Sequence, residues 1–356
     1  MDCLQDWPEP VVRVQSISES GAQSIPERYV KPPSERPSDT SVCGDSGGAG
    51  IPVIDLSMLG RCSQTVRAVS DACREWGFFQ VVNHGVSAEL MRRARAVWKG
   101  FFHQPMDVKQ RYANSPKTYE GYGSRLGIEK GAILDWGDYY FLHFRPLTLM
   151  SHEKWPSLPP SLSRATTDEY GRELTRLCGR VMRILSEGLG LEEGRLGAAF
   201  GGEEVGVCMR VNFYSKCPQP ELTLGLSSHS DPGGITVLLV DDRVKGLQVR
   251  KDGAWVTVQP IADAFIVNVG DQIQVLSNAV YRSVEHRVLV SATDERLSMA
   301  FFYNPRSDLP LAPVPELVTP DRPALYQPMT FDEYRLFIRK RGPRGKSQVE
   351  SLKTVE

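Results

Sequence analysis

The sequence predicts a mainly β protein of the α+β class, in which helices flank a double-stranded β-helix, or jelly roll. Residues 205–307 contain many short apolar segments, each broken by Gly, Pro or Asp, and this density is typical of jelly-roll strands. Helical periodicity occurs on both sides of this region and is longest at 167–189. The chain has 356 residues, 41% of them hydrophobic, which is enough to bury a large core.

The pattern divides the chain into five segments. Residues 1–50 are polar and rich in Pro, Ser and Gly, so they are predicted to form an N-terminal arm and linker, with the linker at 45–50. Two apolar clusters, at 7–14 and 25–30, predict that the arm packs on the body. The other segments are an N-terminal α/β region (51–160), bracing helices (161–204), the jelly roll (205–307), and a C-terminal helix and tail (308–356).

The N-terminal α/β region is predicted to alternate strands with helices. The expected strands lie at 51–56 and 78–82, and the expected helices at 64–76 and 88–102. The second helix has apolar residues at the spacing of a half-buried helix, namely Leu90, Ala94, Val97 and Phe101. Residues 119–144 are rich in Gly and aromatics, which predicts strands and turns at the edge of a pocket.

The second half of the chain is predicted to hold the jelly roll between two helices. The helix at 167–189 is expected to brace the barrel. The predicted jelly-roll strands span 207–214, 235–240, 247–250, 255–258, 264–269, 283–290 and 297–302. A final helix is predicted at 330–340, where Thr330 and Glu333 form a capping box that fixes its start.

Three residues in the jelly roll form a candidate metal site. His229 and Asp231 stand two apart, in a stretch that Pro232 and two glycines keep extended or turning, so both side chains can reach one ion. With His286 they provide two imidazoles and one carboxylate, the ligand set of non-haem Fe(II) oxygenases. Catalytic zinc also uses three protein ligands, so these residues alone leave a zinc hydrolase open.

A candidate anion clamp follows ten residues after His286. Arg296 and Ser298 lie two apart on a predicted strand and therefore share one face. A guanidinium and a hydroxyl can together bind a carboxylate. A 2-oxo acid could chelate iron at one end and meet this clamp at the other, which favours iron over zinc.

Strand periodicity extends the candidate pocket. Because side chains two apart on a strand face the same way, Arg210 shares a face with Asn212 and Tyr214. The same alternation places Phe302 on the face of Arg296. The pocket therefore has a further guanidinium and an aromatic wall.

Helix periodicity adds two more arginines. On the final helix Phe331, Arg335 and Arg339 recur at intervals of four and so share one face. If this face closes over the barrel mouth, the pocket suits a small apolar molecule with a carboxylate. The alternative is a solvated helix face on which the arginines pair with Asp332.

Taken together, these motifs resemble the signature of the plant 2-oxoglutarate- and Fe(II)-dependent dioxygenases. The resemblance covers residues 51–345 and includes WGFFQVVNHG at 76–85 and NFYSKCPQP at 212–220. Three further segments resemble the jasmonate-induced oxygenases, namely TYEGYGSRLG at 118–127, GAILDW at 131–136 and GPRGKS at 342–347. The chain departs from the common plant pattern at Ser215, Ser228 and Ser230, none of which is a predicted iron ligand.

The resemblance implies a cupin-like jelly roll that uses Fe(II), 2-oxoglutarate and O2, with ascorbate as reductant. It implies that 2-oxoglutarate is bound at its far carboxylate by the arginine and serine of the clamp, and faced by the asparagine and tyrosine of the NFYSKCPQP segment. The implied residues of the iron and co-substrate sites are His229, Asp231, His286, Arg296, Ser298, Asn212 and Tyr214.

The resemblance also implies a substrate. The jasmonate-induced oxygenases hydroxylate jasmonic acid on its pentenyl tail to 12-hydroxyjasmonate, which inactivates a hormone of defence and growth. The matching substrate residues are Arg210, Arg335, Arg339, Phe141, Phe302 and Phe331. One alternative is a flavonoid oxidase resembling anthocyanidin synthase, but flavonoids lack a carboxylate for the arginines. Another is a non-catalytic small-molecule binding protein, which the loss of an iron ligand would favour.

Composition narrows the partners and the compartment. A net charge of −1 without a long basic run argues against nucleic acid, and no apolar run approaches the ~18 residues of a membrane span. Seven scattered cysteines and no secretory signal predict reduced thiols in the cytosol or nucleus. The sequence gives no indication of oligomeric state. The remaining histidines are expected to be structural or exposed, namely His84, His103, His143 and His152.

Overall fold

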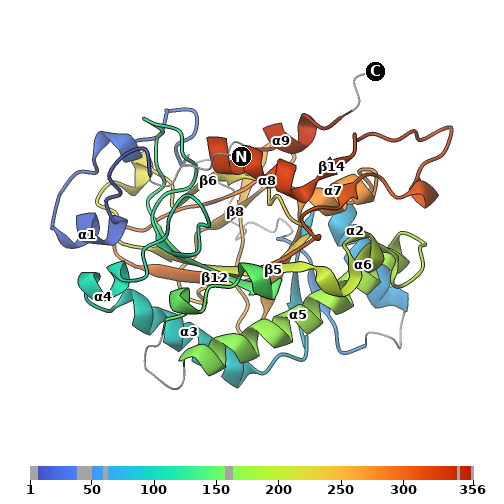
Figure 1. Ribbon diagram of the computed structural model, residues 1–356, viewed down its shortest axis with the longest axis horizontal. Helices are drawn as coiled ribbons and strands as arrows, with labels where there is room; N and C mark the ends of the chain where they lie inside the picture. The colour runs from blue at the N-terminus through green and yellow to red at the C-terminus, as the bar shows by residue number, and fades with distance from the viewer. Residues whose placement is uncertain (1–6, 38–49, 59–62, 157–162, 343–344, 354–356) are drawn as a thin grey trace.

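Two facing β-sheets form the centre of the protein, as the computed structural model shows (Figure 1). The structure describes residues 7–37, 50–58, 63–156, 163–342 and 345–353. The predicted linker at 45–50 lies outside the described residues, apart from Gly50.

The larger sheet has eight strands within the described residues, in the order β1-β2-β10-β7-β12-β5-β4-β3. Their bounds are β1 Val53–Asp55, β2 Phe78–Val82, β3 Gly121–Gly123, β4 Asp138–Arg145, β5 Gly206–Tyr214, β7 Ile235–Leu239, β10 Phe265–Val269 and β12 Arg296–Asn304. β1 and β2 are parallel, and each of the other pairings in this sheet is antiparallel.

The smaller sheet has the order β6-β11-β8-β9 within the described residues. Its strands are β6 Leu226–His229, β8 Leu247–Lys251, β9 Ala254–Thr257 and β11 His286–Val288. A short pair, β13 Pro310–Leu311 and β14 Met329–Thr330, precedes the last helices. After β5 the chain crosses repeatedly between the two sheets, with β8 and β9 forming a hairpin in the smaller one, which confirms the predicted jelly roll.

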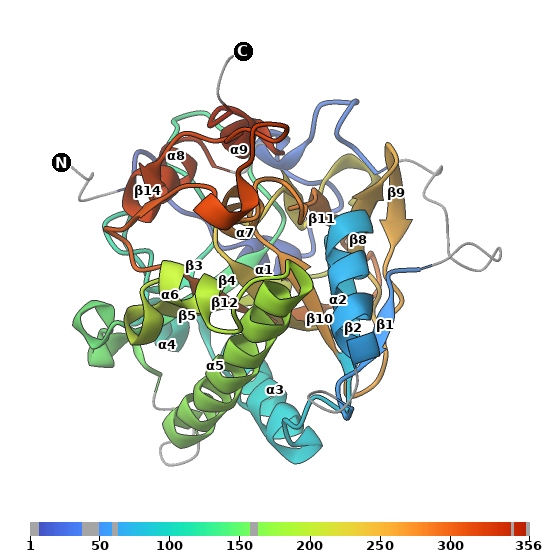
Figure 2. The ribbon, with the colours of Figure 1, turned by 90° about the vertical axis from the view of Figure 1, so that its right-hand side faces the viewer.

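Helices cover the two sheets from different sides (Figures 1 and 2). The bounds are α1 Val14–Glu19, α2 Ser63–Glu75, α3 Ala88–Phe102, α4 Met106–Gln110, α5 Ser163–Gly188, α6 Arg195–Ala199, α7 Asp271–Leu276, α8 Phe331–Arg341 and α9 Ser347–Glu350. α3 and α5 lie beneath the larger sheet, and α8 and α9 lie on the opposite side, near the smaller sheet. None of the described helices combines the length and apolar character needed to cross a membrane.

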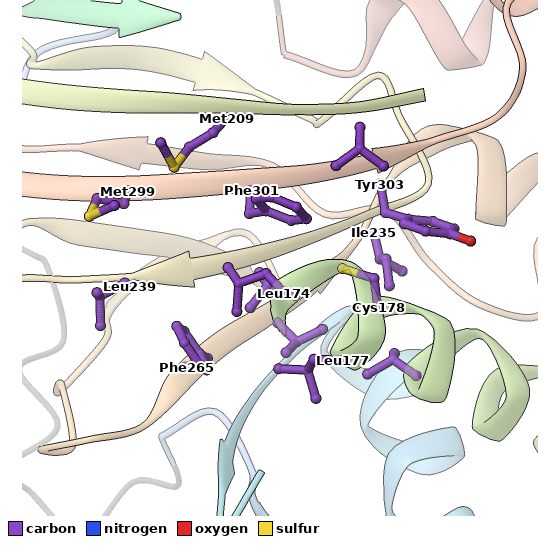
Figure 3. Packing of buried hydrophobic residues seen from close by; sticks show 14 of the residues in the cluster. Leu174, Leu177, Cys178, Met209, Ile235, Leu239, Phe265, Met299, Phe301 and Tyr303 are labelled. Atoms are coloured by element: carbon purple, nitrogen blue, oxygen red, sulfur yellow. The ribbon is translucent and has the colours of Figure 1, made fainter. Parts of the chain in front are cut away.

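The larger sheet has two different faces because side chains alternate along its strands. On one face Met209, Met299 and Phe301 are fully buried, and they point toward Leu174 and Leu177 of α5 (Figure 3). The even-numbered residues of β5 and β12 therefore point to the opposite side, toward the smaller sheet. This alternation sets which residues can form a site between the sheets.

The N-terminal arm packs on the body, as its apolar clusters predict. Val14, Ile25 and Tyr29 are buried in one cluster with Trp136 and Cys217. The first turn of α1 is held by a buried carboxylate, because the N–H groups of residues 14 and 15 donate to Asp138 at 3.1 and 2.9 Å. The arm is thus part of the folded unit.

Two sequence predictions need correction. In α3, Trp98 and not Val97 lies in the core, because Trp98 follows the line of Leu90 and Ala94 at intervals of four. The strand predicted at 283–290 is shorter, since β11 begins at His286. The N–H of Ser283 donates to the Gln274 side chain at 2.9 Å, so the chain at Ser283 is tied to α7, and it joins the smaller sheet only at Glu285, whose carbonyl accepts from Arg250 at 2.9 Å.

The capping box of the final helix is confirmed. Thr330 N–H donates to the Glu333 carboxylate at 3.0 Å, and Glu333 N–H donates to the Thr330 hydroxyl at 3.3 Å. These reciprocal bonds satisfy backbone donors that the first helical turn leaves without partners. They fix where α8 starts, and hence which of its residues face the barrel.

A matched pair of glycines in α5 tests its packing against the sheet. We expect Gly171→Ala to destabilise the protein by about 1–3 kcal/mol, because a Cβ there would lie 2.2 Å from Cε1 of the buried Phe144. Gly179→Ala, in the same helix, has no neighbour within 4 Å and should stabilise by about 0.5–1 kcal/mol. Urea unfolding of both variants measures the difference, and equal midpoints would contradict this packing.

Candidate active site

The three predicted metal ligands meet between the two sheets. His229 ends β6, Asp231 follows two residues later, and His286 opens β11 opposite His229 in the strand register. The Nε2 atoms of both histidines lie 3.6 Å from Oδ1 of Asp231. One candidate ligand atom from each of the three residues lies within 4.8 Å of the other two, so one ion can contact all three.

Hydrogen bonds on the far side of each group orient the ligands. Nδ1 of His229 lies 2.8 Å from the Ser227 carbonyl, and Nδ1 of His286 lies 3.2 Å from the Val284 carbonyl. Each carbonyl accepts from an Nδ1–H, which leaves the Nε2 lone pair free to bind a metal. Oδ2 of Asp231 accepts from two side chains, Thr236 at 2.5 Å and Asn268 at 2.8 Å, so Oδ1 is the oxygen left for the ion.

The charge states also suit a divalent cation. Burial, with the neighbouring His229 adding to the effect, lowers the pKa of His286 to about 4, so its imidazole is neutral at pH 7. Burial raises the pKa of Asp231, but His286, His229 and Asn268 outweigh this and hold that pKa below its ordinary value. Two imidazoles and one carboxylate on one side of an ion fit Fe(II) and leave other positions open.

The predicted clamp lies further along the larger sheet. Arg296 on β12 pairs in register with Tyr214 on β5, and Ser298 pairs with Asn212. The Arg296 guanidinium is buried and donates through Nε to the Val244 carbonyl at 3.2 Å, while Nη1 has no partner. A buried donor without a partner is costly, so a carboxylate of 2-oxoglutarate fits here.

All the predicted site residues line one cavity of about 270 Å³. The two histidines of the predicted metal site lie on its smaller-sheet side, and the predicted clamp lies on its larger-sheet side. The residues that the structure brings together are His229, Asp231, His286, Arg296, Ser298, Asn212, Tyr214, Arg210, Arg335, Arg339, Phe141, Phe302 and Phe331. All the even-numbered residues of β5 and β12 line this cavity, as strand alternation predicts.

Three guanidinium groups lie around the part of the cavity away from the clamp. Arg210 stacks 4.2 Å from the centre of the Tyr139 ring, and its buried Nε has no partner. Arg339 lies 5.4 Å from the centre of the Tyr119 ring. Arg335 pairs with Asp332 at 2.6 Å, the ion pair that the alternative interpretation of this helix allows, and it still lines the cavity.

Sequence analysis missed part of the cavity wall. His143, expected to be structural or exposed, lines the cavity beside Phe141, with ring centroids 4.9 Å apart. Burial lowers its pKa to about 4, with Arg335 and Arg339 adding to the effect, so the ring is neutral at pH 7. Tyr119 and Tyr139 also line the cavity, in agreement with the pocket edge predicted for residues 119–144. The sequence contains a signal for this, because residues 139, 141 and 143 are two apart along β4 and so share one face of the strand.

Family profiles match two separate regions of the chain. Residues 206–305 match the 2OG-Fe(II) oxygenase superfamily. Residues 51–160 match the non-haem dioxygenase in morphine synthesis N-terminal family. The first match contains the predicted metal ligands and the predicted clamp.

Relatives match nearly the whole chain. Jasmonate-induced oxygenase 1 of Arabidopsis thaliana is 61% identical, covering 98% of this chain and 87% of the relative. Leucoanthocyanidin dioxygenase of Malus domestica is 37% identical, covering 90% of this chain and 93% of the relative. The crystal structure of JOX2 in complex with 2OG, Fe and JA is 60% identical and superposes with a TM-score of 0.92, covering 98% of this chain and 100% of that one. The chain therefore belongs to the jasmonate-induced oxygenases of the 2OG-Fe(II) oxygenase superfamily, and it is an Fe(II)- and 2-oxoglutarate-dependent dioxygenase.

Proposed function

We propose that this enzyme hydroxylates jasmonic acid on its pentenyl tail, giving 12-hydroxyjasmonate and so inactivating the hormone. The reaction consumes jasmonic acid, 2-oxoglutarate and O2, and it forms 12-hydroxyjasmonate, succinate and CO2. One oxygen atom of O2 enters the hydroxyl group and the other enters succinate. No other reductant is needed for a coupled turnover, and ascorbate serves to keep the iron ferrous.

The observation that supports this substrate is the composition of the cavity wall. Arg210, Arg335 and Arg339 place three cations around a cavity that also has aromatic walls from Phe141, Phe302 and Phe331. A carboxylate with an apolar body matches that wall. Jasmonic acid has one carboxylate, a ring and an apolar tail, and the crystal structure of the relative JOX2 contains JA.

In the proposed arrangement the residues of the cavity orient two molecules that carry carboxylates, 2-oxoglutarate and jasmonic acid. When bound by His229, Asp231 and His286, ferrous iron with 2-oxoglutarate supplies the O2 activation and C–H oxidation of the reaction. Arg296 and Ser298 hold the far carboxylate of 2-oxoglutarate. The three cavity arginines bind the jasmonate carboxylate, which leaves the apolar tail to extend toward the metal ligands.

The alternatives are less well supported. A flavonoid offers no carboxylate to the three arginines, and the flavonoid enzyme leucoanthocyanidin dioxygenase is 37% identical, against 61% for the jasmonate-induced oxygenase. A non-catalytic binding protein has no need of three converging ligands with oriented lone pairs. A zinc hydrolase leaves the Arg296 clamp without a use.

The direct test is product analysis with a panel of substrates. Protein loaded anaerobically with Fe(II), 2-oxoglutarate and ascorbate is mixed with oxygenated buffer containing jasmonic acid or a flavonoid. We expect succinate and 12-hydroxyjasmonate in equal amounts with jasmonic acid, measured by mass spectrometry. Succinate that rises only with flavonoids would reject the jasmonate assignment while leaving the dioxygenase class intact.

Two substitutions on α8 test the substrate site. Arg335→Ala and Arg339→Ala should each raise the KM for jasmonic acid by about 10- to 100-fold, the effect of losing a hydrogen bond between charged groups. The KM for 2-oxoglutarate and its slow uncoupled decay should change little. Steady-state kinetics with each substrate varied in turn measures both values.

Lys340→Ala is the matched control, because Lys340 is exposed on the same helix and does not line the cavity. It should leave both KM values unchanged. If Arg335→Ala and Lys340→Ala behave alike, the alternative of a solvated helix face is correct for Arg335. If an arginine variant instead raises the KM for jasmonic acid and the KM for 2-oxoglutarate equally, the substitution has damaged the fold.

The proposed compartment is reducing, either the cytosol or the nucleus. The cysteines in the described part of the chain are free and buried, namely Cys73, Cys178, Cys208 and Cys217. Burial raises the pKa of the Cys208 thiol to about 12, so this thiol on the substrate strand is unreactive at neutral pH. Imaging of the tagged chain would test the location.

A further inference from the structure

A buried carboxylate links the metal ligands to the helix that carries the substrate arginines. Asp271 opens α7 and is 1% exposed. Its Oδ2 accepts hydrogen bonds from the Ser230 hydroxyl at 3.1 Å and from the Tyr334 hydroxyl at 2.6 Å. Ser230 stands between His229 and Asp231 in the chain, and Tyr334 lies on α8.

The backbone reinforces both ends of this link. The N–H of Asp271 donates to the carbonyl of the metal ligand Asp231 at 2.8 Å. The N–H of Ser230 donates to the carbonyl of Gly345 at 3.2 Å, so the chain after α8 also contacts the metal-binding turn. Tyr334 is 1% exposed and adjoins Arg335, which faces the cavity. A shift of α8 would therefore reach the metal ligands through the hydrogen bonds of Tyr334 and Asp271.

The cost of leaving the Asp271 carboxylate without a donor favours a linked motion of α8 and the metal-binding turn over independent motions of the two. A buried carboxylate that loses a donor pays a desolvation cost, so Asp271 is stable only while both hydroxyls reach it. If α8 moves away, Tyr334 leaves and the carboxylate is left with one side-chain donor on Oδ2. A ligand that binds Arg335 and Arg339 holds α8 in place and so preserves the second donor. Ligand binding on α8 then stabilises the turn that contains two metal ligands.

We infer that Asp271, with Tyr334 and Ser230, is a positioning group that couples occupancy of the substrate site to the order of the metal-binding turn. The inference rests on the proposed function, because the occupant of α8 is the carboxylate substrate. Its role is to keep oxygen activation tied to a bound substrate. None of the three side chains needs to touch the substrate for this.

Tyr334→Phe tests the link, and Tyr326→Phe is the matched control. Tyr326 is 2% exposed in the same apolar cluster, and its hydroxyl bonds to Gln274 at 2.8 Å and not to Asp271. Both variants lose one buried hydroxyl, and Tyr334→Phe should lose more stability than Tyr326→Phe because its partner is a carboxylate. Only Tyr334→Phe should lower the yield of 12-hydroxyjasmonate per succinate, by about two- to tenfold, as expected for one net hydrogen bond.

A second readout is independent of turnover. Hydrogen exchange is followed under anaerobic conditions on protein loaded with Fe(II) and 2-oxoglutarate, with and without jasmonic acid. Jasmonic acid should slow exchange in the turn at 228–234 in the parent enzyme and in Tyr326→Phe. It should have little effect on that turn in Tyr334→Phe. Ser230→Ala, which removes the other donor, should reproduce the loss of protection.

The outcomes separate the link from the proposed function. If the parent enzyme forms hydroxyjasmonate but Tyr334→Phe matches Tyr326→Phe in yield and in exchange, the link is wrong and the function stands. If the parent enzyme forms no hydroxyjasmonate, the proposed function fails first. A variant that changes only its unfolding temperature shows that Asp271 has a purely structural role, which also overturns the inference.

Discussion

Asp231→Asn will lose tight iron binding and, with it, succinate formation, by more than about 100-fold. The loss exceeds the 10- to 100-fold typical of groups that only orient a ligand, because the amide removes the one anionic ligand of the set. The change also places an amide where Oδ2 now accepts hydrogen bonds from Thr236 and Asn268. Anaerobic titration with Fe(II), followed by succinate analysis after oxygen is added, measures both effects.

Thr236→Val gives the graded comparison for this site. It leaves the Asp231 carboxylate in place but removes the 2.5 Å hydrogen bond to Oδ2, so iron affinity should fall by about 10- to 100-fold. Asp231→Asn should have the larger effect, because it replaces the carboxylate itself. Thr236→Val only removes a hydrogen bond that orients this carboxylate. An asparagine variant that keeps parental iron affinity would mean that this carboxylate is not a ligand.

Much of the site could be predicted because strand alternation is local. On β12 the residues Arg296, Ser298 and Phe302 line the cavity while Met299 and Phe301 are buried against α5. The face on which a strand residue lies follows from its neighbours in the sequence alone, because side chains alternate with a period of two. The convergence of His286 with His229 is different, because it depends on the strand pairing of β11 with β6. It could be inferred only from the combination of residue types.

The parts that sequence did not predict depend on register or on distant contacts. His143 was missed because residues 119–144 were predicted to form strands and turns without an assigned register, so the face shared with Phe141 was not defined. The role of Asp271 was missed for another reason. Its partners Ser230 and Tyr334 are 41 and 63 residues away, and no periodicity within one element can bring them together. α7 is also buried all round, so it has no amphipathic pattern to detect.

Arg296→Lys should raise the KM for 2-oxoglutarate by about 10- to 100-fold while it changes the KM for jasmonic acid little. The planar guanidinium can offer two donors to a carboxylate, whereas an ammonium acts as a single compact charge. The loss of one hydrogen bond between charged groups corresponds to about 1.5–3 kcal/mol, which sets the expected range. Succinate formation at varied 2-oxoglutarate, with jasmonic acid saturating, measures the change.

Arg287→Lys is the control for this substitution, because it makes the same chemical change at another buried arginine. Arg287 is 3% exposed on β11, bonds to Gln248 at 2.8 Å, and does not line the catalytic cavity. It should lower stability without changing the KM for 2-oxoglutarate. If Arg296→Lys and Arg287→Lys shift that KM equally, the effect comes from general loss of packing. If only Arg296→Lys shifts it, the Arg296 guanidinium binds the co-substrate, and its unpartnered Nη1 is a donor available for this contact.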